Sequence, residues 1–339
     1  MVKEITSKKD WNAVLSQVDT YDFYHTFDYH HISKNENTET PVLVTYTSHD
    51  VLIALPLLLR PIENTPFFDF TSIYGYGGTV SKNVTSDFDN TNFINEIQAY
   101  FNSKNIVSVF SRLHPYIESQ KPILKNFGNI TSLGKVVNID VSLPIEESRR
   151  VYQKSLKNQV NKLRRTCTVR KANTKEDILE FVDIYHENMN RLNADNSYFF
   201  KPEYFLNFIE QTDFKTDVLL VEDLESQKVI AGSMFVKTNG MVQFHLSGTR
   251  TDYLRLKPSK LFLDEMRIEA TEQNFKYFNL GGGLGSKEDS LFEFKSSFSK
   301  DFRTFEIWKC VINQEVYDEL SSNNSSTTNS NYFPLYRAN

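Results

Sequence analysis

Cysteine is scarce in this chain. Only two of its 339 residues are cysteines, Cys167 and Cys310, and they show no spacing typical of a metal site. Small secreted folds stapled by disulfides need several cysteines, so this class is disfavoured. Two cysteines indicate a reducing compartment, and we expect a cytoplasmic protein without a bound metal.

Long apolar runs are also missing. The N-terminus, MVKEITSKKDW, lacks the apolar core of a signal peptide. The longest apolar stretch, Val51 to Leu59, is interrupted by Pro56 and is too short to cross a bilayer. We therefore expect no transmembrane segment.

There is no excess of basic charge. Lys and Arg number 38 against 43 Asp and Glu, which gives a formal net charge of -5. No long-range basic field attracts nucleic acid, so we expect no DNA partner, and any site for a polyanion must be local. The apolar content of 40% is enough for two ordinary cores in a chain of this length.

The same order of elements is predicted twice along the chain. The first half shows a helix opened by Ser7 and Asp10, a hairpin over 42–59, a strand near 67–74, a helix over 90–101 and a strand over 105–110. The second half shows a helix opened by Thr174 and Asp177, strands over 218–221, 229–237 and 241–247, a helix over 259–273 and a strand over 277–280.

This repetition predicts two copies of one α/β unit with mixed sheets. The predicted domains are 1–145 and 146–320, followed by a tail at 321–339. The tail is rich in Ser, Asn and Thr and should be mobile, with an aromatic end at 332–336 that can dock as a clasp. The alternative is one large α+β domain whose elements match by chance.

Polar residues alternate along the strand over 241–247. Alternation places Gln243, His245 and Ser247 on one face, where they can line a cleft. Because imidazole titrates near neutral pH, His245 is a candidate base that deprotonates an attacking amine. The alternative for His245 is a hydrogen-bonded histidine with a structural role.

A basic loop precedes the next predicted helix. Arg255, Lys257, Ser259 and Lys260 surround a helix N-terminus, where backbone N–H groups and the helix dipole favour phosphate. They are therefore candidate ligands for the phosphate of an acyl donor. An ordinary solvated loop with Ser259 as the N-cap is the alternative.

A glycine-rich turn follows the strand over 277–280. Asn279 precedes four glycines within 281–285, which allow close backbone approach to a ligand or to another strand. The pattern fits neither a Rossmann fingerprint nor a Walker A loop, so we exclude nucleotide hydrolysis. Farther on, Lys295 lies between Phe294 and Phe298, where a partly desolvated cation can stabilise developing negative charge; an ordinary solvated lysine is the alternative.

Two further basic features are candidates for phosphate binding. The stretch 152–165 predicts an amphipathic helix, and its basic side chains can hold phosphates of RNA or of a nucleotide-linked substrate: Lys157, Lys162, Arg164 and Arg165. A solvated basic surface is the alternative. Arg191 can bind a diphosphate in a bidentate manner, or it can simply complement a helix C-terminus.

Several of these stretches together resemble the Fem family of peptidoglycan-bridge aminoacyltransferases and their GNAT-like relatives. The resemblance is carried by SLKNQVNKLRR, YHENMNRLNADNSYFF, GTRTDYLRLKPSKLFLDEM, YFNLGGGLGSKEDSLFEFKSSF, and Trp308 followed by INQEVYDEL. It is strongest from about residue 150 to 320. It implies two tandem GNAT-like (N-acetyltransferase) domains that receive an acyl donor and an amine-bearing acceptor, without a covalent enzyme intermediate.

The resemblance also implies roles for single residues. Lys295 matches a lysine associated with activity, and Arg191 matches an arginine associated with a nucleotide-linked acceptor. We add Tyr198, Gln243, Ser247 and Asn279 as candidate substrate contacts. The acceptor implied is an amine of a cell-envelope precursor or amino sugar.

The acyl donor is left open between aminoacyl-tRNA and acyl-CoA, with no tightly bound cofactor. Arg255-x-x-Pro258-x-Lys260 lacks the glycine that CoA-binding GNAT loops usually carry, which argues against the usual mode of CoA binding. Two rival functions remain: an acetyl-CoA-dependent N-acetyltransferase in surface polysaccharide biosynthesis, and a non-catalytic module that binds RNA or a protein partner. The oligomeric state is not predicted.

Overall fold

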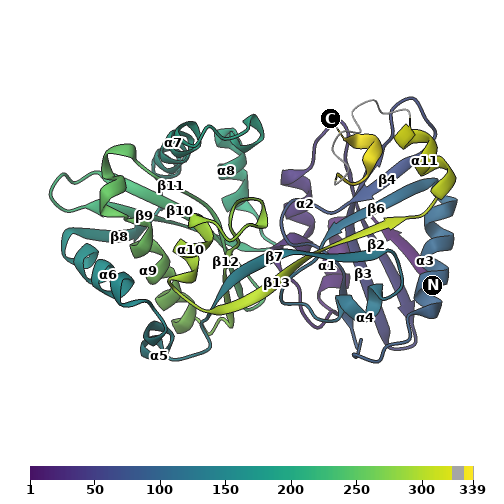
Figure 1. Cartoon of the computed structure of the whole chain (residues 1–339), viewed down its shortest axis with the longest axis horizontal. Helices are drawn as coiled ribbons and strands as arrows, with labels where there is room; N and C mark the ends of the chain where they lie inside the picture. Colours follow the sequence, from purple (N-terminus) through teal and green to yellow (C-terminus); the bar gives the residue numbers. More distant parts are fainter. Residues whose placement is uncertain (323–331, 339) are drawn as a thin grey trace. The chain divides into compact units, whose positions relative to one another are not determined.

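The chain forms two compact units (Figure 1). A computed structural model describes residues 1–322 and 332–338. Unit 1 comprises Met1–Leu133 and Thr304–Asn339, and unit 2 comprises Gly134–Arg303. Residues 323–331 and residue 339, all within the predicted mobile tail, lie outside the described residues.

Unit 1 is built on a mixed sheet with the strand order β1-β2-β3-β4-β6-β13, and β5 pairs with β3. The strands are β1 (Val2–Ile5), β2 (Thr40–Ser48), β3 (Val51–Pro61), β4 (Phe68–Thr71), β5 (Val80–Lys82), β6 (Ile106–Arg112) and β13 (Asp301–Val311). The helices are α1 (Lys8–Leu15), α2 (Phe27–Ser33), α3 (Thr91–Ser103), α4 (Gln120–Leu124) and α11 (Gln314–Ser322), with short 3₁₀ turns η1 (Phe23–His25) and η5 (Leu335–Arg337).

Both faces of this sheet are covered. On one face, Phe93, Ile97 and Phe101 of α3 enter the largest apolar cluster of the unit, because their spacing places them on one side of the helix. On the other face, the fully buried Trp11 of α1 packs with Leu43 of β2. The capping predicted for this helix is present, since the Ser7 hydroxyl accepts from the Asp10 N–H.

Unit 2 repeats the plan with the strand order β7-β12-β11-β10-β9-β8. The strands are β7 (Asn129–Asp140), β8 (Cys167–Lys171), β9 (Lys215–Asp223), β10 (Val229–Thr238), β11 (Met241–Thr249) and β12 (Tyr277–Gly281). The helices are α5 (Ile145–Arg150), α6 (Lys154–Thr166), α7 (Lys175–Arg191), α8 (Pro202–Glu210), α9 (Ser259–Glu272) and α10 (Ser290–Ser296), with 3₁₀ turns η2 (Asn196–Tyr198), η3 (Thr251–Leu256) and η4 (Leu284–Ser286).

In unit 2, α6 and α9 cover one face of the sheet, and α7 and α8 cover the other (Figure 1). Phe262 of α9 lies in the apolar cluster of the first face together with Leu156 of α6. Phe205 of α8 meets Phe181 of α7 at a ring-centroid distance of 5.8 Å. The capping box predicted at Thr174 and Asp177 opens α7.

The two units share one topological feature that matters for function. Within the described residues, the registered parallel pairs are β4 with β6 in unit 1 and β11 with β12 in unit 2. A crossover helix joins each pair, α3 in the first and α9 in the second. In parallel sheets, ligands bind beyond the carboxyl ends of such strands, so these two places are the natural sites to search.

The units differ in their bounds from the predicted domains 1–145, 146–320 and 321–339. The chain leaves unit 1 along β7 and returns along β13, whose residues 307–311 pair with β6 in antiparallel register. Trp308 is 1% exposed and lies in the core of unit 1, where its indole N–H donates to the Phe127 carbonyl. The residues from 304 to 320 therefore belong to the first unit.

The aromatic end of the chain docks on unit 1. The Tyr336 hydroxyl is 2.8 Å from the Ser108 hydroxyl, and the Arg337 Nε donates to Asp69 at 2.6 Å. Phe333 packs in a small apolar cluster with Tyr317 of α11. Residues 332–338 thus act as the clasp that the sequence indicates.

Candidate functional site

The parallel strands β11 and β12 part within unit 2. Their registered pairs run from Met241–Tyr277 to Gln243–Asn279. Beyond that pair, β11 continues to Thr249 and β12 to Gly281, and no further pair joins them in the described part of the chain. The ladder of registered pairs between the two strands therefore ends at Gln243 and Asn279.

Bulges lie on both strands at this point. In β11, Phe244 pairs with Phe235 of β10 and Leu246 pairs with the adjacent Met234, so His245 is an extra residue. In β12, the register against β7 shifts between Asn279 and Gly281. Bulges bend a strand and redirect its side chains, and they are common next to active sites.

The bulge changes which side chains share a face. Ser247 pairs with Ser233, and Phe244 pairs with Phe235. Ser233 and Phe235 are two apart on β10 and point to the same side, so Ser247 lies on the face of Phe244 and not on that of Gln243. The predicted polar face of Gln243, His245 and Ser247 is therefore wrong for Ser247, because simple alternation does not continue through a bulge.

Gln243 and Asn279 join the two strands where they begin to part. Each is 1% exposed, and the Asn279 Nδ2 donates to the Gln243 Oε1 at 2.8 Å. The Asn279 Oδ1 in turn accepts from the Gly281 N–H at 2.9 Å. Gly281 has a φ of 74°, which favours glycine. The two amides thus hold the bend of β12, and their contact with substrate stays a prediction.

Lys295 of α10 lies where the strands part. Its Nζ donates to the Gly282 carbonyl at 2.6 Å, just after β12, and lies 5.8 Å from the centroid of the Phe244 ring on β11. The residue is only 7% exposed, so the alternative of an ordinary solvated lysine does not apply. Burial lowers the pKa of Lys295 to about 8, opposed by the negative charge of Asp289.

The glycine-rich turn serves the packing of the chain itself. A Cβ at Gly283 would lie 2.1 Å from the Lys287 carbonyl oxygen, and one at Gly282 would lie 2.8 Å from that of Lys135. Real side chains do not fit at such distances. The sequence predicted that these glycines allow close approach of a ligand or of another strand. In the structure, the backbone of the chain itself makes this close approach.

His245 does not meet Lys295. Its ring lies 5.1 Å from that of Phe208 on α8, whereas Lys295 faces Phe244 and the α9 side of the sheet. Burial lowers the pKa of His245 to about 4, so the imidazole is neutral at physiological pH. The structure therefore separates the two residues predicted to act together in catalysis.

The basic loop before α9 retains several cations. Lys257 has a left-handed φ of 56°, and Pro258, not Ser259, takes the N-cap position without a side-chain cap. Arg255 and Lys257 are exposed, while the Lys260 Nζ donates to Gln159 at 2.6 Å. Within the described residues none of the three cations pairs with a carboxylate, so phosphate binding at this helix end stays a prediction.

The basic helix α6 is partly engaged in structure. Its apolar residues Leu156, Val160 and Leu163 are buried, as predicted. Arg164 pairs with Asp264 at 2.8 Å and also with Glu265, both on α9, so it fastens one helix to the other. Lys157 donates to the Arg150 carbonyl at 2.9 Å.

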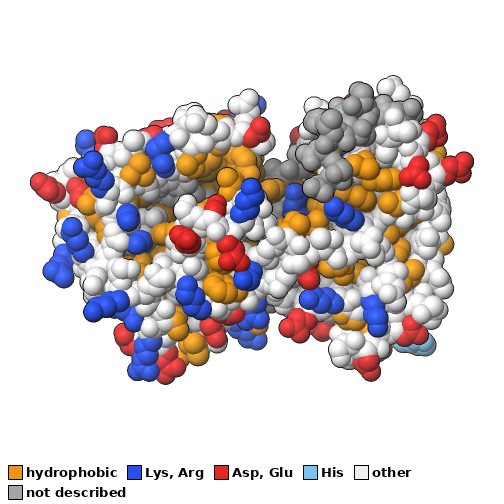
Figure 2. Space-filling view, viewed as in Figure 1, with side chains coloured by type: hydrophobic (Ala, Val, Ile, Leu, Met, Phe, Trp, Pro, Cys, Tyr) orange, Lys and Arg blue, Asp and Glu red, His pale blue; other side chains and the backbone are white. Residues whose placement is uncertain are grey.

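Lys162 and Arg165 of α6 stay exposed and available for a partner. Figure 2 shows several basic side chains along the outer edge of unit 2, with acidic ones above and below them.

Arg191 and Tyr198 lie at and just after the end of α7. Arg191 is exposed and donates to the side chain of Asn188, one turn earlier. Tyr198 is 37% exposed, and its carbonyl accepts from the Tyr185 hydroxyl at 2.9 Å. Helix α7 covers the face of the sheet opposite α9, so these two residues and Lys295 come from different sides (Figure 1).

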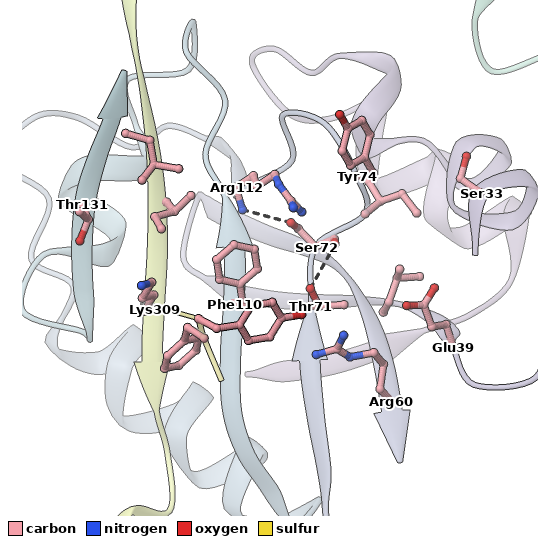
Figure 3. Close-up of a pocket in the computed structure, with 16 residues that line it drawn as sticks. Ser33, Glu39, Arg60, Thr71, Ser72, Tyr74, Phe110, Arg112, Thr131 and Lys309 are labelled. Atoms are coloured by element: carbon pink, nitrogen blue, oxygen red, sulfur yellow. Dashed lines mark hydrogen bonds between the residues drawn. The ribbon is translucent and has the colours of Figure 1, made fainter. Parts of the chain in front are cut away.

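One feature of unit 1 was not found by sequence reasoning. A cavity of about 720 Å³ lies at the carboxyl ends of β4 and β6, and Arg60, Arg112 and Lys309 line it (Figure 3). A signal was available, because Arg112 comes two residues after the apolar strand predicted over 105–110. A polar residue at the carboxyl end of a parallel strand is a candidate ligand contact.

Known proteins share both the sequence pattern and the fold. Residues 219–305, which span β9 to α10 and the start of β13, match the FemAB family. The structure is similar to that of FemX, with a TM-score of 0.72 and 10% identity over 94% of this chain and 99% of that one. No curated protein sequence matches the chain.

Two other solved structures share the fold. One is a conserved protein of unknown function from Bacteroides thetaiotaomicron, with a TM-score of 0.58 and 12% identity over 92% of this chain and all of that one. The other is the C-terminal domain of a protein described as a lysylphosphatidylglycerol synthetase from Agrobacterium fabrum, with a TM-score of 0.54 and 13% identity over 92% of this chain and 96% of that one.

The predicted resemblance to Fem-type proteins is confirmed over residues 219–305, together with the predicted mixed α/β fold. At identities of 10–13% the structural likeness shows the fold alone. Among the described residues, no helix combines the length and the apolar character that a membrane span requires.

Proposed function

We propose that this protein is an acyltransferase that moves an aminoacyl or acyl group onto an amine. The observation that carries the proposal is the parting of β11 and β12 with Lys295 held between Gly282 and Phe244. The match to the FemAB family covers these elements and so supports the assignment to this part of the chain.

The reaction needs a neutral amine, an acyl carbon and a leaving group that takes a proton. The amine nitrogen attacks the acyl carbon, a C–N bond forms, and the ester C–O or thioester C–S bond breaks. The proton lost by the nitrogen balances the one gained by the leaving oxygen or sulfur. Positioning of both substrates supplies much of the rate, and backbone N–H groups beside the parted strands stabilise the oxyanion.

Lys295 fits this chemistry as a buried cation. With its pKa lowered to about 8, it is mostly protonated at neutral pH yet can release its proton readily. It can stabilise negative charge on the tetrahedral intermediate or protonate the leaving group. His245 enters as a base only through a water or a change of position, because it packs against Phe208 on the other side of the sheet.

For the acceptor, we propose an amine of a cell-envelope precursor or of a nucleotide-linked amino sugar. The support is the Fem-type resemblance and the exposed Arg191 and Tyr198, whose guanidinium and phenol suit a diphosphate and a sugar ring. The donor is either aminoacyl-tRNA or acyl-CoA.

A second candidate is an acetyl-CoA-dependent N-acetyltransferase in surface polysaccharide biosynthesis. The observation that favours it is the start of α9, which has no side-chain cap and lies beside Lys257 and Lys260. Backbone N–H groups at such a helix end are suited to the phosphates of a coenzyme. A non-catalytic RNA-binding role is less well supported, because Arg164 of the basic helix is held by carboxylates.

Transfer by the purified protein tests the proposal. The protein is incubated with acetyl-CoA or with charged tRNA and a panel of amine acceptors, and a gain in acceptor mass is measured. The control is Lys287→Ala, which removes an exposed lysine of the same region. Transfer by wild type and by Lys287→Ala, but not by Lys295→Ala, supports the proposal. Absence of transfer with both donors, in the presence of salt-sensitive RNA binding, would overturn it.

A further inference from the structure

The cavity of unit 1 has a floor made by four neighbouring strands. Leu58 of β3 pairs with Thr71 of β4, Thr71 with Phe110 of β6, and Phe110 with Lys309 of β13. Directly paired residues lie side by side on one face of a sheet, and all four line the cavity. This face is opposite to the one that α3 covers, since Phe70 and Val109, the neighbours of Thr71 and Phe110, belong to the α3 core.

The parting of the parallel strands shapes this cavity as well. The last registered pair of β4 and β6 is Thr71–Phe110, after which the Ser72 N–H donates to the Phe110 carbonyl. The Ser72 hydroxyl then accepts from the Arg112 N–H at 3.1 Å (Figure 3). The side chain of Arg112 is thereby placed at the carboxyl ends of both strands, where α/β sheets bind their ligands.

Three cations line the cavity. The Arg112 guanidinium lies 5.4 Å from the centroid of the Tyr74 ring and 5.3 Å from that of Phe110, so two aromatic rings hold it. The Lys309 ammonium lies 5.7 Å from the Phe333 ring of the clasp.

Arg60 is the third cation, and the carboxylate of Asp69 orients its side chain. Its Nε donates to Asp69 at 2.8 Å, which leaves its terminal nitrogens without a hydrogen bond among the described residues. Asp69 is fully buried and also accepts from Arg337 and Tyr336, so two guanidinium groups face one carboxylate. The buried charge therefore orients Arg60 without cancelling the positive charge of the cavity.

Only one carboxylate, that of Glu39, joins the residues that line the cavity in the described part of the chain, and it accepts from the Asn35 N–H. Three cations against one carboxylate favour a ligand with more than one negative charge. Guanidinium groups bind phosphate oxygens in pairs of hydrogen bonds, and the rings of Tyr74, Phe110 and Phe333 suit a flat apolar group. A volume of about 720 Å³ is that of a small-molecule site.

We propose that this cavity is a binding site for a phosphate ester that carries a flat apolar group. It is a second site, built within unit 1, and it is independent of the transfer chemistry proposed for unit 2. The phosphate would lie against Arg112 and Arg60, and the apolar group against the aromatic rings.

Phenyl phosphate is the probe that tests the site, with inorganic phosphate, benzoate and benzyl alcohol as comparisons. Calorimetric titration of the full chain should show phenyl phosphate binding more tightly than inorganic phosphate or benzoate, and no binding of benzyl alcohol. Arg112→Gln should weaken the binding of phenyl phosphate at least tenfold. Lys309→Gln should weaken it only a few-fold, because an ammonium group is a point charge and cannot form the paired hydrogen bonds that a guanidinium forms with phosphate.

The matched control is the double variant Arg255→Gln with Lys257→Gln, which removes two exposed cations of unit 2 and should leave the affinity unchanged. Lys309→Gln keeps the proposal testable if Arg112→Gln does not fold, because the Lys309 ammonium lies over the Phe333 ring and makes no ion pair among the described residues. The proposal is overturned if phenyl phosphate does not bind, if folded variants of Arg112 and Lys309 bind it as wild type does, or if the unit 2 variant abolishes binding.

Discussion

The two units place different chemistry at the same point of one topology. In unit 2, the parallel strands part around a buried lysine and a buried pair of amides, Gln243 and Asn279. In unit 1, they part around Arg112, and a cavity lined by cations remains. The fold fixes where two parallel strands separate, whereas the residues at the strand ends determine what each separation can bind.

The largest expected effect tests whether the last strand, β13, belongs to the core of unit 1. Trp308→Ala should lower the free energy of unfolding by about 3–5 kcal/mol, the usual cost of truncating a buried aromatic residue. Because Trp308 lies in the core of unit 1, hydrogen exchange should rise in β6 and α3 and stay unchanged in β9 and β10. Exchange that rises only in unit 2 would contradict the assignment of β13.

The next effect concerns Lys295. If it stabilises the oxyanion or the leaving group, Lys295→Ala should lower kcat by about 10²–10³, the cost of removing one such group. Circular dichroism and thermal unfolding show whether the variant is folded, and Lys287→Ala should keep wild-type kcat. A folded Lys295→Ala variant with full activity would remove Lys295 from the mechanism.

The pH dependence of transfer follows from the lowered pKa of Lys295. The lysine is protonated below about pH 8 and neutral above it, so a step that needs the cation slows as the pH rises through 8. Deprotonation of the acceptor amine acts in the opposite direction, and kcat/KM should pass through a maximum. In Lys295→Arg the guanidinium stays protonated, so any activity that this variant retains should no longer decline above pH 8. A decline equal to that of wild type would point to another group.

The smallest effect is expected at His245. The imidazole packs against Phe208, so His245→Phe should reduce kcat only a few-fold, whereas loss of a general base costs about 10²–10⁴. Steady-state kinetics at pH 7 decides between the two. A loss of the larger size would place His245 in the reaction after all and would show that β11 changes conformation during turnover.

Much of the fold could be predicted because local signals and tertiary structure agree. The caps at Ser7 and Thr174 open helices, and the apolar strand over 105–110 corresponds to β6. Strand β13 was missed, although Ile307, Trp308 and Cys310 are residue types favoured in strands. Its partner, β6, lies almost 200 residues earlier, and a pairing at that separation leaves no signal in a local window.

The candidate site was predicted in part. Lys295 was identified from its aromatic neighbours Phe294 and Phe298, which do lie in or against the apolar core of unit 2. The face of Ser247 was predicted wrongly because the bulge at His245 depends on pairing with β10, which the sequence of β11 alone does not contain. The cavity of unit 1 is lined by residues from four strands and from the end of the chain, so no single sequence motif predicts it.

The path of the chain along β7 and back along β13 has a consequence for biosynthesis. Unit 2 is one uninterrupted stretch, whereas unit 1 is assembled from two stretches separated by the whole of unit 2. A ribosome therefore releases every strand of unit 2 before it releases the final strand of unit 1. Until then β6 has an open edge and Phe127 lacks its indole partner, so the half made first is the half completed last.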